Sequence, residues 1–595
     1  MTVPSLAEKT FPYSWPVLIA FWLVTPFHIV LSQLQWIQTD WSGGRFESIV
    51  NAEARSSPGE LLLKTLPAHM VHAFSPTQLE GIWDMEVLNG KLYLAACTNP
   101  LMVNGGDVIA YDYATDTWSL EYSVWEQGVI RLVAHNGKLY VPGADSQGSW
   151  RWGNIYIYDG TSWVRKGTVP NGIHVFDLIF YRGEMFVTTG TNVDNWSGKL
   201  YKSTDEGDSW TEAFRVEAED GKQENFRRLY FMGIFRDTLY IQSDLRPPEG
   251  KVVFRYSDGG IDAMSNPRLS GGYGMFLAYN AMLYFLDRQY LHRYNGSAWK
   301  SFPVPFSGNF MTRSMIEYGG FLYAGAHQGT LYRTADGTLW QKVSQTIPRD
   351  EEIEALASYH GRLYASTVKS NGHGSVYVSA AVPRGHLVSE KYDFGVPVRG
   401  AVIDWDALNP SPSTAISFQV RTANTSDELD SLPFTGPDGT AASYYTAPGT
   451  PLHFQHEAHR WIQYKVYLAT TDSAYTPVLQ EVRITTTTSS VNKPIARSTA
   501  LRVNLYQNFP NPVGMNSPSG QVWTTAAFEI HGHAADVSLE LHDMLGRTVR
   551  SLWNGPVFPG PHVLRINTGD LSSGMYLIRL TTQNATASAV INVLN

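Results

Sequence analysis

The stretch Val87-Leu-Asn-Gly-Lys-Leu-Tyr-Leu94 decides the fold, because the chain repeats its pattern seven times. Each copy is an apolar run, a two-residue turn and a second run that carries an aromatic residue. These aromatic residues are Tyr93, Tyr140, Phe186, Tyr240, Tyr284, Tyr323 and Tyr364. Asn-Gly and related pairs adopt the positive φ angles of a tight hairpin, and aromatic and β-branched flanks favour strands. Each copy therefore predicts a β-hairpin.

The spacing of the copies predicts how the hairpins assemble. Successive aromatic residues are 47, 46, 54, 44, 39 and 41 residues apart. A period of forty-odd residues with a hairpin in each repeat is typical of four-stranded propeller blades. We therefore expect an all-β protein in which residues 81–385 form a seven-bladed β-propeller.

A turn motif in the third repeat supports this interpretation. Ser203-Thr-Asp-Glu-Gly-Asp-Ser-Trp210 matches the Asp-box pattern in full. We expect the Asp205 side chain to accept turn amides and Gly207 to adopt positive φ. The repeat resembles kelch-like and Asp-box propellers, which include both enzymes and binding proteins, so the motif identifies blades and not chemistry.

Composition narrows the class of protein further. Hydrophobic residues make up 43% of the 595 residues, which is enough for real cores, and the net charge of −9 without a lysine-rich block argues against a nucleic-acid partner. The single cysteine, Cys97, excludes an internal disulfide and a cysteine-based zinc site. No motif indicates a metal or a cofactor, and we expect none.

The two ends of the chain predict export. Residues 1–32 read as a signal peptide with cleavage before Gln33, which would leave no stable membrane span; a retained anchor is the alternative. At the other end, Leu505-Tyr-Gln-Asn-Phe-Pro-Asn-Pro512, Leu545-Gly-Arg547 and Gly574-Met-Tyr576 open, turn and complete a run of short strands. Residues 504–595 resemble the type A sorting domain of the type IX secretion system, a small Ig-like β-sandwich. This resemblance implies contact with that secretion machinery and a destination at the outer-membrane cell surface or outside the cell.

Between the propeller and this domain, residues 386–488 lose the repeat and alternate over longer strands, which predicts a β-sandwich resembling discoidin-like or fibronectin-like modules. A polar linker, 489–503, follows. Residues 33–80 are open to two interpretations. They either pair with the later sandwich, so that the propeller interrupts it, or supply an outer strand that closes the propeller.

Candidate ligand-binding residues follow from propeller geometry, since inner-strand starts and the loops between second and third strands share one face. We name Trp150, Arg151, Trp152, Trp196, Arg131, Arg227 and Arg313 as ligand-binding residues. The same face would carry Arg246, Arg288, His327, His373, Asp84, Asp177, Arg228 and Glu352. Exposed Trp beside Arg is suited to sugars, although packing against a neighbouring blade is an equal alternative.

Chemistry is less clearly indicated than binding. Arg131, Arg227 and Arg313 fall at comparable positions, as a carboxylate-clamping sialidase-like site would require, but no nucleophile pair accompanies them and bracing of blades is the usual role. We therefore assign no catalytic residue. The expected function is a non-catalytic surface or extracellular binding protein with a propeller for glycan or protein ligands. The alternative is a secreted glycosidase with its site at the channel mouth.

Overall fold

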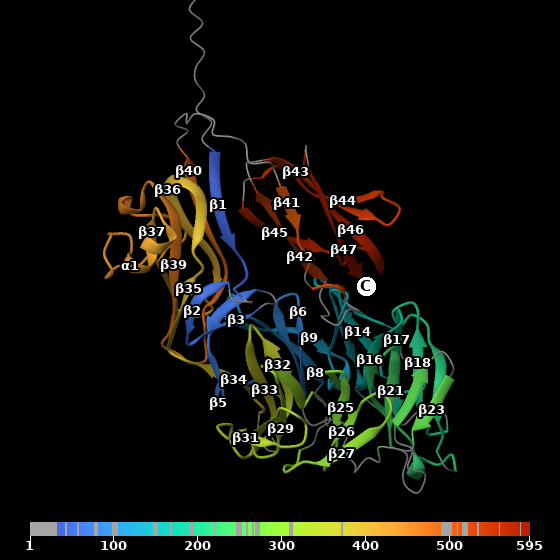
Figure 1. Cartoon of the computed structure of the whole chain (residues 1–595). Coiled ribbons are helices and arrows are strands. Elements are labelled where there is room, and N and C mark those ends of the chain that lie inside the picture. The colour runs from blue at the N-terminus through green and yellow to red at the C-terminus, as the bar shows by residue number, and fades with distance from the viewer. Residues whose placement is uncertain are drawn as a thin grey trace, which may run out of the picture.

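The structure is a computed structural model that describes residues 32–41, 45–55, 59–76, 81–97, 105–146, 153–166, 169–190, 195–218, 220–244, 253–257, 260–264, 267, 274–308, 313–369, 373–488, 502–508, 510–514, 522–531, 535–557, 560–582 and 585–594. Nearly all of the expected signal peptide and linker therefore lie outside the described residues. Within these ranges the regular secondary structure is almost wholly β-strand, with one short α-helix, α1 (Ser426–Ser431), and two 3₁₀ turns, Gln223–Asn225 and Phe454–His456 (Figure 1). No helix in the described part has the length and apolarity to cross a membrane.

The predicted hairpins are present at all seven positions in the described residues. They are β6–β7 (Gly81–Leu88, Lys91–Cys97), β11–β12 (Val133–His135, Lys138–Pro142), β16–β17 (His174–Tyr181, Glu184–Gly190), β20–β21 (Leu229–Phe235, Thr238–Ser243), β24–β25 (Leu277–Tyr279, Met282–Leu286), β28–β29 (Met315–Tyr318, Phe321–Ala326) and β32–β33 (Glu351–Tyr359, Arg362–Lys369). Both turn residues have positive φ in every case, from Asn89 at 48° and Gly90 at 78° to His360 at 42° and Gly361 at 66°. This is the turn geometry that the right-handed strand twist requires, and the hairpin prediction is confirmed.

Two further strands complete each four-stranded unit. In the first six units they follow the hairpin: β8–β9 (Gly106–Asp112, Thr117–Val124), β14–β15 (Ile155–Tyr158, Trp163–Arg165), β18–β19 (Gly198–Ser203, Thr211–Val216), β22–β23 (Val253–Ser257, Gly260–Met264), β26–β27 (Tyr290–Tyr294, Trp299–Pro303) and β30–β31 (Thr330–Thr334, Gln341–Ser344). The seventh unit differs, because β34 (Val376–Ala381) pairs with β5 (Thr65–Phe74), a strand that precedes the first hairpin. Two short strands, β10 (Glu126–Gly128) and β13 (Ala144–Ser146), extend the third unit's sheet.

Apolar clusters between neighbouring units join them into a propeller-like region. Tyr93 of the first unit packs with Leu139 of the second, and comparable clusters lie between each later pair. The seventh unit meets the first through a cluster that contains Met85 and Tyr364. The row of units therefore returns to its start.

A two-sheet body precedes and follows this region in sequence. Its later strands are β35 (Arg384–Ser389), β36 (Tyr392–Leu408), β37 (Thr414–Ala423), β38 (Thr450–Pro451), β39 (His459–Thr470) and β40 (Val478–Thr488). Its earlier strands pair with them: β1 (Ser32–Gln38) and β4 (Glu60–Leu63) with β40, and β2 (Phe46–Val50) with β35, while β3 (Ala52–Arg55) pairs with β4. The buried Trp41 indole donates to the Tyr464 hydroxyl at 2.7 Å. The N-terminal segment is thus divided: β1 to β4 pair within the two-sheet body, and β5 pairs with β34 of the seventh unit.

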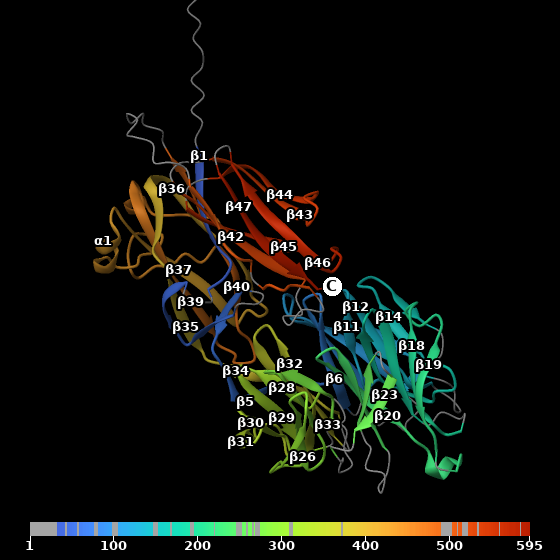
Figure 2. The same cartoon turned by 45° about the vertical axis from the view of Figure 1, so that its right-hand side comes forward.

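This sandwich meets the hairpin end of the propeller-like region (Figure 2). The buried Arg362, beside the last hairpin turn, donates to the Ser473 carbonyl at 3.0 Å, and Tyr113 donates to the Thr476 carbonyl. The described turns between second and third strands, 287–289 and 327–329, lie at the opposite end of their units, away from these contacts with the sandwich.

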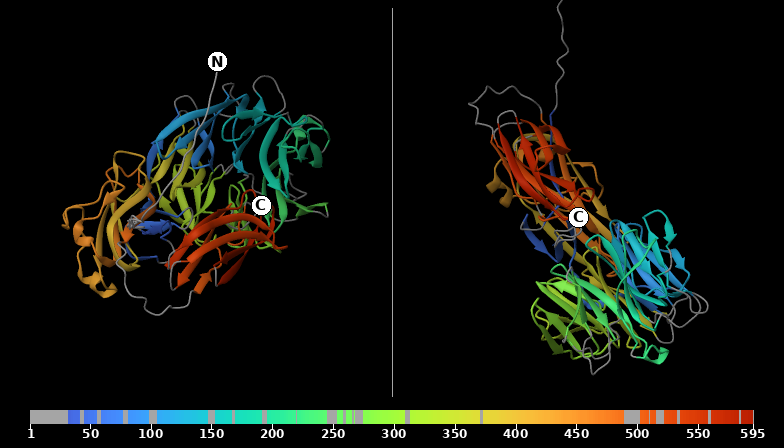
Figure 3. Two further views of the ribbon diagram at one scale, coloured as in Figure 1. Left: turned by 90° about the horizontal axis from the view of Figure 1, so that it is seen from above. Right: turned by 90° about the vertical axis from the view of Figure 1, so that its right-hand side faces the viewer.

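The C-terminal strands form a third body, seen in red in Figure 3. One sheet contains β41 (Arg502–Leu505), β42 (Trp523–His531) and β45 (Gly560–Asn567); the other contains β43 (Ala535–Asp543), β44 (Thr548–Val557), β46 (Gly574–Thr581) and β47 (Thr586–Val593). Buried side chains from both sheets, such as Phe528 and Leu539, share one core. This region is sandwich-like, as the sequence predicts.

Candidate functional site

Charged side chains of the first three units meet where their inner strands begin. Arg131 Nε lies 2.7 Å from Asp177 Oδ1, and its Nη1 lies 3.2 Å from Asp84 Oδ2. All three residues are buried. The carboxylates also accept backbone N–H groups of the next unit, from Leu132 to Asp84 at 2.9 Å and from Met232 to Asp177 at 2.8 Å. These bonds connect four successive units.

Arg313 reaches the same group from the sixth unit. It donates to the Met85 carbonyl at 2.7 Å, to the Leu132 carbonyl at 3.1 Å and to the Glu86 carboxylate, and its Nε lies 3.6 Å from Asp84 Oδ1. Burial opposes its charge, but Asp84 and Glu86 raise the pKa of the Arg313 guanidinium above its ordinary value. Arg313 is thus a brace across the ring, and we call Asp84, Glu86, Arg131, Asp177 and Arg313 the channel network.

Two of the three candidate clamp arginines, Arg131 and Arg313, therefore come together, but at carboxylates of the protein itself. The third, Arg227, lies in a different group: it is 4% exposed, its Nη1 donates to the Asn225 carbonyl at 3.2 Å, and its N–H donates to the Trp196 carbonyl at 2.9 Å. The part-buried Trp196 has a φ of 50° in the turn before β18. Arg131 and Arg313 are already paired with carboxylates of the protein, and removing either would leave a buried charge uncompensated.

The other candidates on this end are spread over several units. Arg228 lies over the rings of Phe226 and Phe176, at 4.5 and 5.7 Å from their centroids. His327 Nδ1 is 2.8 Å from Glu352 Oε1. Arg288 and His373 are exposed. Trp150, Arg151, Trp152 and Arg246 lie outside the described residues.

The Asp-box has the turn geometry that its sequence predicts. Asp205 accepts the Ser209 N–H at 2.8 Å and the Ser209 hydroxyl at 2.6 Å, and Gly207 has a φ of 89°. The hydrogen bonds from Ser209 lower the pKa of the Asp205 carboxyl to about 2. Asp336 holds a similar turn by accepting the Thr338 N–H at 2.8 Å. These aspartates are structural turn residues.

Glu126 on β10 is a buried acid that the sequence analysis missed. Its Oε1 accepts the Tyr156 hydroxyl at 3.1 Å and the Asn154 side-chain amide, whereas its Oε2 has no hydrogen-bond partner among the described residues. Burial raises the pKa of the Glu126 carboxyl to about 7, although the hydrogen bonds oppose this shift. A single Glu between Trp125 and Gln127 has no local signal of burial, because β10 is only three residues long.

In the described part of the chain, no three His, Cys, Asp or Glu residues are grouped as a metal site.

Comparison with known protein families identifies the type of the C-terminal domain. A family model described as a secretion system C-terminal sorting domain matches residues 509–593. No sequence among the curated proteins matches the chain.

Several solved structures resemble the propeller-like half. One is a GH93 α-L-arabinofuranosidase of Fusarium graminearum with arabinobiose, at 12% identity over 52% of this chain and 96% of that chain, with a TM-score of 0.30. Another is the WD40 β-propeller domain of Doa1, at 10% identity over 52% of this chain and 97% of that chain, with a TM-score of 0.36. A third is a Penicillium chrysogenum α-L-arabinanase with arabinobiose, at 15% identity over 53% of this chain and 98% of that chain, with a TM-score of 0.30.

The matched C-terminal domain defines the class of this protein. It is a protein secreted by the type IX system to the cell surface or the extracellular space, and its four-stranded units form a propeller-like region over about half its length.

Proposed function

We propose that this protein is an exported, non-catalytic binding protein. Its seven four-stranded units form a seven-bladed β-propeller, closed by β5, that presents a glycan- or protein-binding platform outside the cell. The signal peptide 1–32 starts export and the domain 504–595 completes it. Strands β1–β4 and residues 386–488 form one sandwich, which acts as a spacer or a second binding module.

The observation that carries this proposal is the pairing of the channel network. Glycosidases place two carboxyl groups about 5–10 Å apart over an open cleft. Here Asp84 and Asp177 are fully buried and both contact Arg131, while Glu86 contacts Arg313. Carboxylates held in this way stabilise the ring and are not available to a substrate.

The uncovered end supports a binding role. The sandwich packs at the hairpin end, so its described contacts leave the turns 287–289 and 327–329, at the opposite end of their units, uncovered. Trp196, Arg288, His327 and His373 belong to this end, and the Gly/Ser-rich loop with Trp150 and Trp152 belongs to it by sequence. Aromatic rings beside cations and imidazoles suit sugar rings and their hydroxyls.

A glycan array probed with the full chain tests the platform. We expect a positive signal that both Trp150→Ala and Trp152→Ala reduce, while Trp553→Ala, at a 45% exposed site in the C-terminal domain, leaves it unchanged. No signal in any arm would favour protein partners over glycans. Release of sugars from the array by the wild-type protein would overturn the non-catalytic role.

A separate experiment tests export. A chain that lacks residues 504–595 should accumulate in the periplasm. If it still reached the surface, the role of this domain as the export signal would be wrong.

A further inference from the structure

The outer face of the sandwich, which the proposed function leaves as either a spacer or a second binding module, carries a row of aligned residues. Antiparallel register aligns Val50 of β2 with His386 of β35, His386 with Tyr467 of β39, and Tyr467 with Ser417 of β37. The alternate residues of these strands, such as Leu387 and Val466, are buried in the sandwich core. Because side chains alternate between the faces of a sheet, the row points outward.

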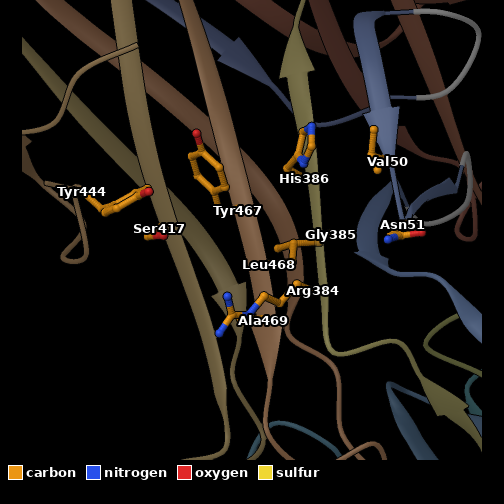
Figure 4. Close-up of a pocket in the computed structure, with 10 residues that line it drawn as sticks. All are labelled: Val50, Asn51, Arg384, Gly385, His386, Ser417, Tyr444, Tyr467, Leu468 and Ala469. Atoms are coloured by element: carbon orange, nitrogen blue, oxygen red, sulfur yellow. The ribbon is translucent and has the colours of Figure 1, made fainter. Parts of the chain in front are cut away.

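A groove follows this row because small residues form its floor. In the next register row Arg384 pairs with Ala469, whose methyl group fills little space. Gly385 must stay small, since a Cβ there would lie 2.3 Å from the Asn51 carbonyl oxygen. The groove has a volume of about 440 Å³ (Figure 4), within the range of small-ligand sites, about 300–1,000 Å³.

Two tyrosines form a fixed aromatic wall. The rings of Tyr444 and Tyr467 meet edge to face with centroids 5.2 Å apart, and Tyr444 is 41% exposed. The Tyr467 hydroxyl donates to Gln419 Oε1 at 2.8 Å. Tyr445 exchanges two backbone hydrogen bonds of 2.9 Å with Phe418, which hold the Tyr444 loop against the sheet. The wall is therefore ordered before a ligand arrives, which lowers the entropic cost of binding.

The groove is positively charged in a protein whose net charge is −9. Arg384 is exposed, lines the groove and makes no ion pair with another described residue, and Lys465 Nζ lies 5.0 Å from the centroid of the Tyr467 ring. None of the described residues that line the groove is an Asp or a Glu. Burial and the neighbouring Lys465 lower the pKa of His386, so its imidazole is neutral and can both donate and accept a hydrogen bond.

We propose that this groove binds an acidic sugar, a uronic acid residue of a polysaccharide. Its carboxylate pairs with the Arg384 guanidinium, its ring lies against the Tyr444 and Tyr467 wall, and Ser417, His386 and Asn51 offer hydrogen bonds to its hydroxyls. The charged donor and the aromatic wall together match the two faces of such a sugar. Addition of a peptide strand is not favoured here, because β35 is paired on both sides, by β2 and β39.

Calorimetric titration of the full chain with oligogalacturonate tests this site. We expect binding that Arg384→Gln and Tyr444→Ala each weaken by about tenfold or more, since each removes one charged or aromatic contact. The matched control Arg349→Gln, at an exposed arginine of the propeller-like region, should bind as wild type does.

Two further ligands separate charge from shape. Methyl-esterified oligogalacturonate keeps the sugar rings and loses the charge, so its binding should fall by a similar factor. Poly-glutamate keeps the charge and loses the rings, and should bind no better than the ester. No binding of oligogalacturonate, wild-type affinity in Arg384→Gln, or equal affinity for poly-glutamate would overturn the proposal.

Discussion

The channel network and the sandwich groove both contain arginine, but they use it in opposite ways. Arg131 and Arg313 are surrounded by carboxylates and carbonyls of neighbouring units. Arg384 instead is exposed in a groove that Tyr444 and Tyr467 also line, and none of the described lining residues is acidic. A paired and buried charge supports the fold, whereas an open charge next to a fixed aromatic wall is available to a ligand. Burial and pairing therefore separate structural arginines from recognition arginines in this chain.

The largest expected effect on stability concerns the buried arginine of the channel network, Arg131. Arg131→Ala leaves Asp84 and Asp177 without their cation, and we expect it to lower the free energy of unfolding by about 3–5 kcal/mol. Urea unfolding monitored by tryptophan fluorescence measures the change. Arg349→Ala, at an exposed site, should change it by less than about 0.5 kcal/mol. If Arg131→Ala and Arg349→Ala both had equally small effects on the free energy of unfolding, the buried arginine would be no more structural than the exposed one.

Glu126 sharpens the comparison, because it is a buried acid whose described side-chain donors are Asn154 and Tyr156 in place of an arginine. Its pKa is about 7 in the fold and 4.5 in the unfolded chain, so the folded state holds the proton more tightly. Stability should therefore fall as pH rises from about 4.5 to about 7 and change no further above that, for a loss of about 3 kcal/mol. Glu126→Gln cannot ionise and so avoids this loss. Between about pH 4 and pH 8, the free energy of unfolding of the variant should therefore rise relative to that of the wild type by about 3 kcal/mol. If the free energies of unfolding of the wild type and of Glu126→Gln changed in parallel with pH, the raised pKa of Glu126 would be contradicted.

Gly385 tests whether backbone packing shapes the groove. Gly385→Ala places a methyl group against the Asn51 carbonyl, and we expect a loss of stability of about 1–3 kcal/mol from overpacking. Thermal unfolding measures this. Gly395→Ala is a useful contrast, because Gly395 has positive φ (77°) but no atom within 4 Å of the new methyl group, so its cost reports backbone strain alone.

The smallest expected effect on stability concerns Arg384, the exposed arginine of the groove. Arg384→Ala should change the free energy of unfolding by less than about 0.5 kcal/mol, since Arg384 is exposed and has no ion pair in the described structure. The same urea titration applies. A loss comparable to that of Arg131→Ala would make Arg384 a structural residue and break the comparison.

Local patterns of the sequence predict the hairpins because the positive φ pairs need only adjacent residues, such as Asn89 with Gly90. The Asp-box turn is local for the same reason. The closing strand is harder to predict, because Thr65–Phe74 contains Pro67 and its partner β34 lies some three hundred residues away.

The site depends still more on distant contacts. Arg313 could be assigned to the channel from its repeat position, but its partner Glu86 is 227 residues away. The groove combines short segments around Val50, Arg384, Ser417, Tyr444 and Tyr467, none of which carries a motif. Only the strand register of the sandwich brings these residues together.

A double-mutant cycle between Arg131 and Asp177 tests most directly whether the channel charges serve the fold. The single variants Arg131→Ala and Asp177→Ala and the double variant are unfolded in urea under one set of conditions. The 2.7 Å ion pair predicts a coupling free energy above about 1 kcal/mol, with the double variant far less destabilised than the sum of the single variants. Additive effects of the two substitutions would show that the pair does not stabilise the ring, and would contradict the account.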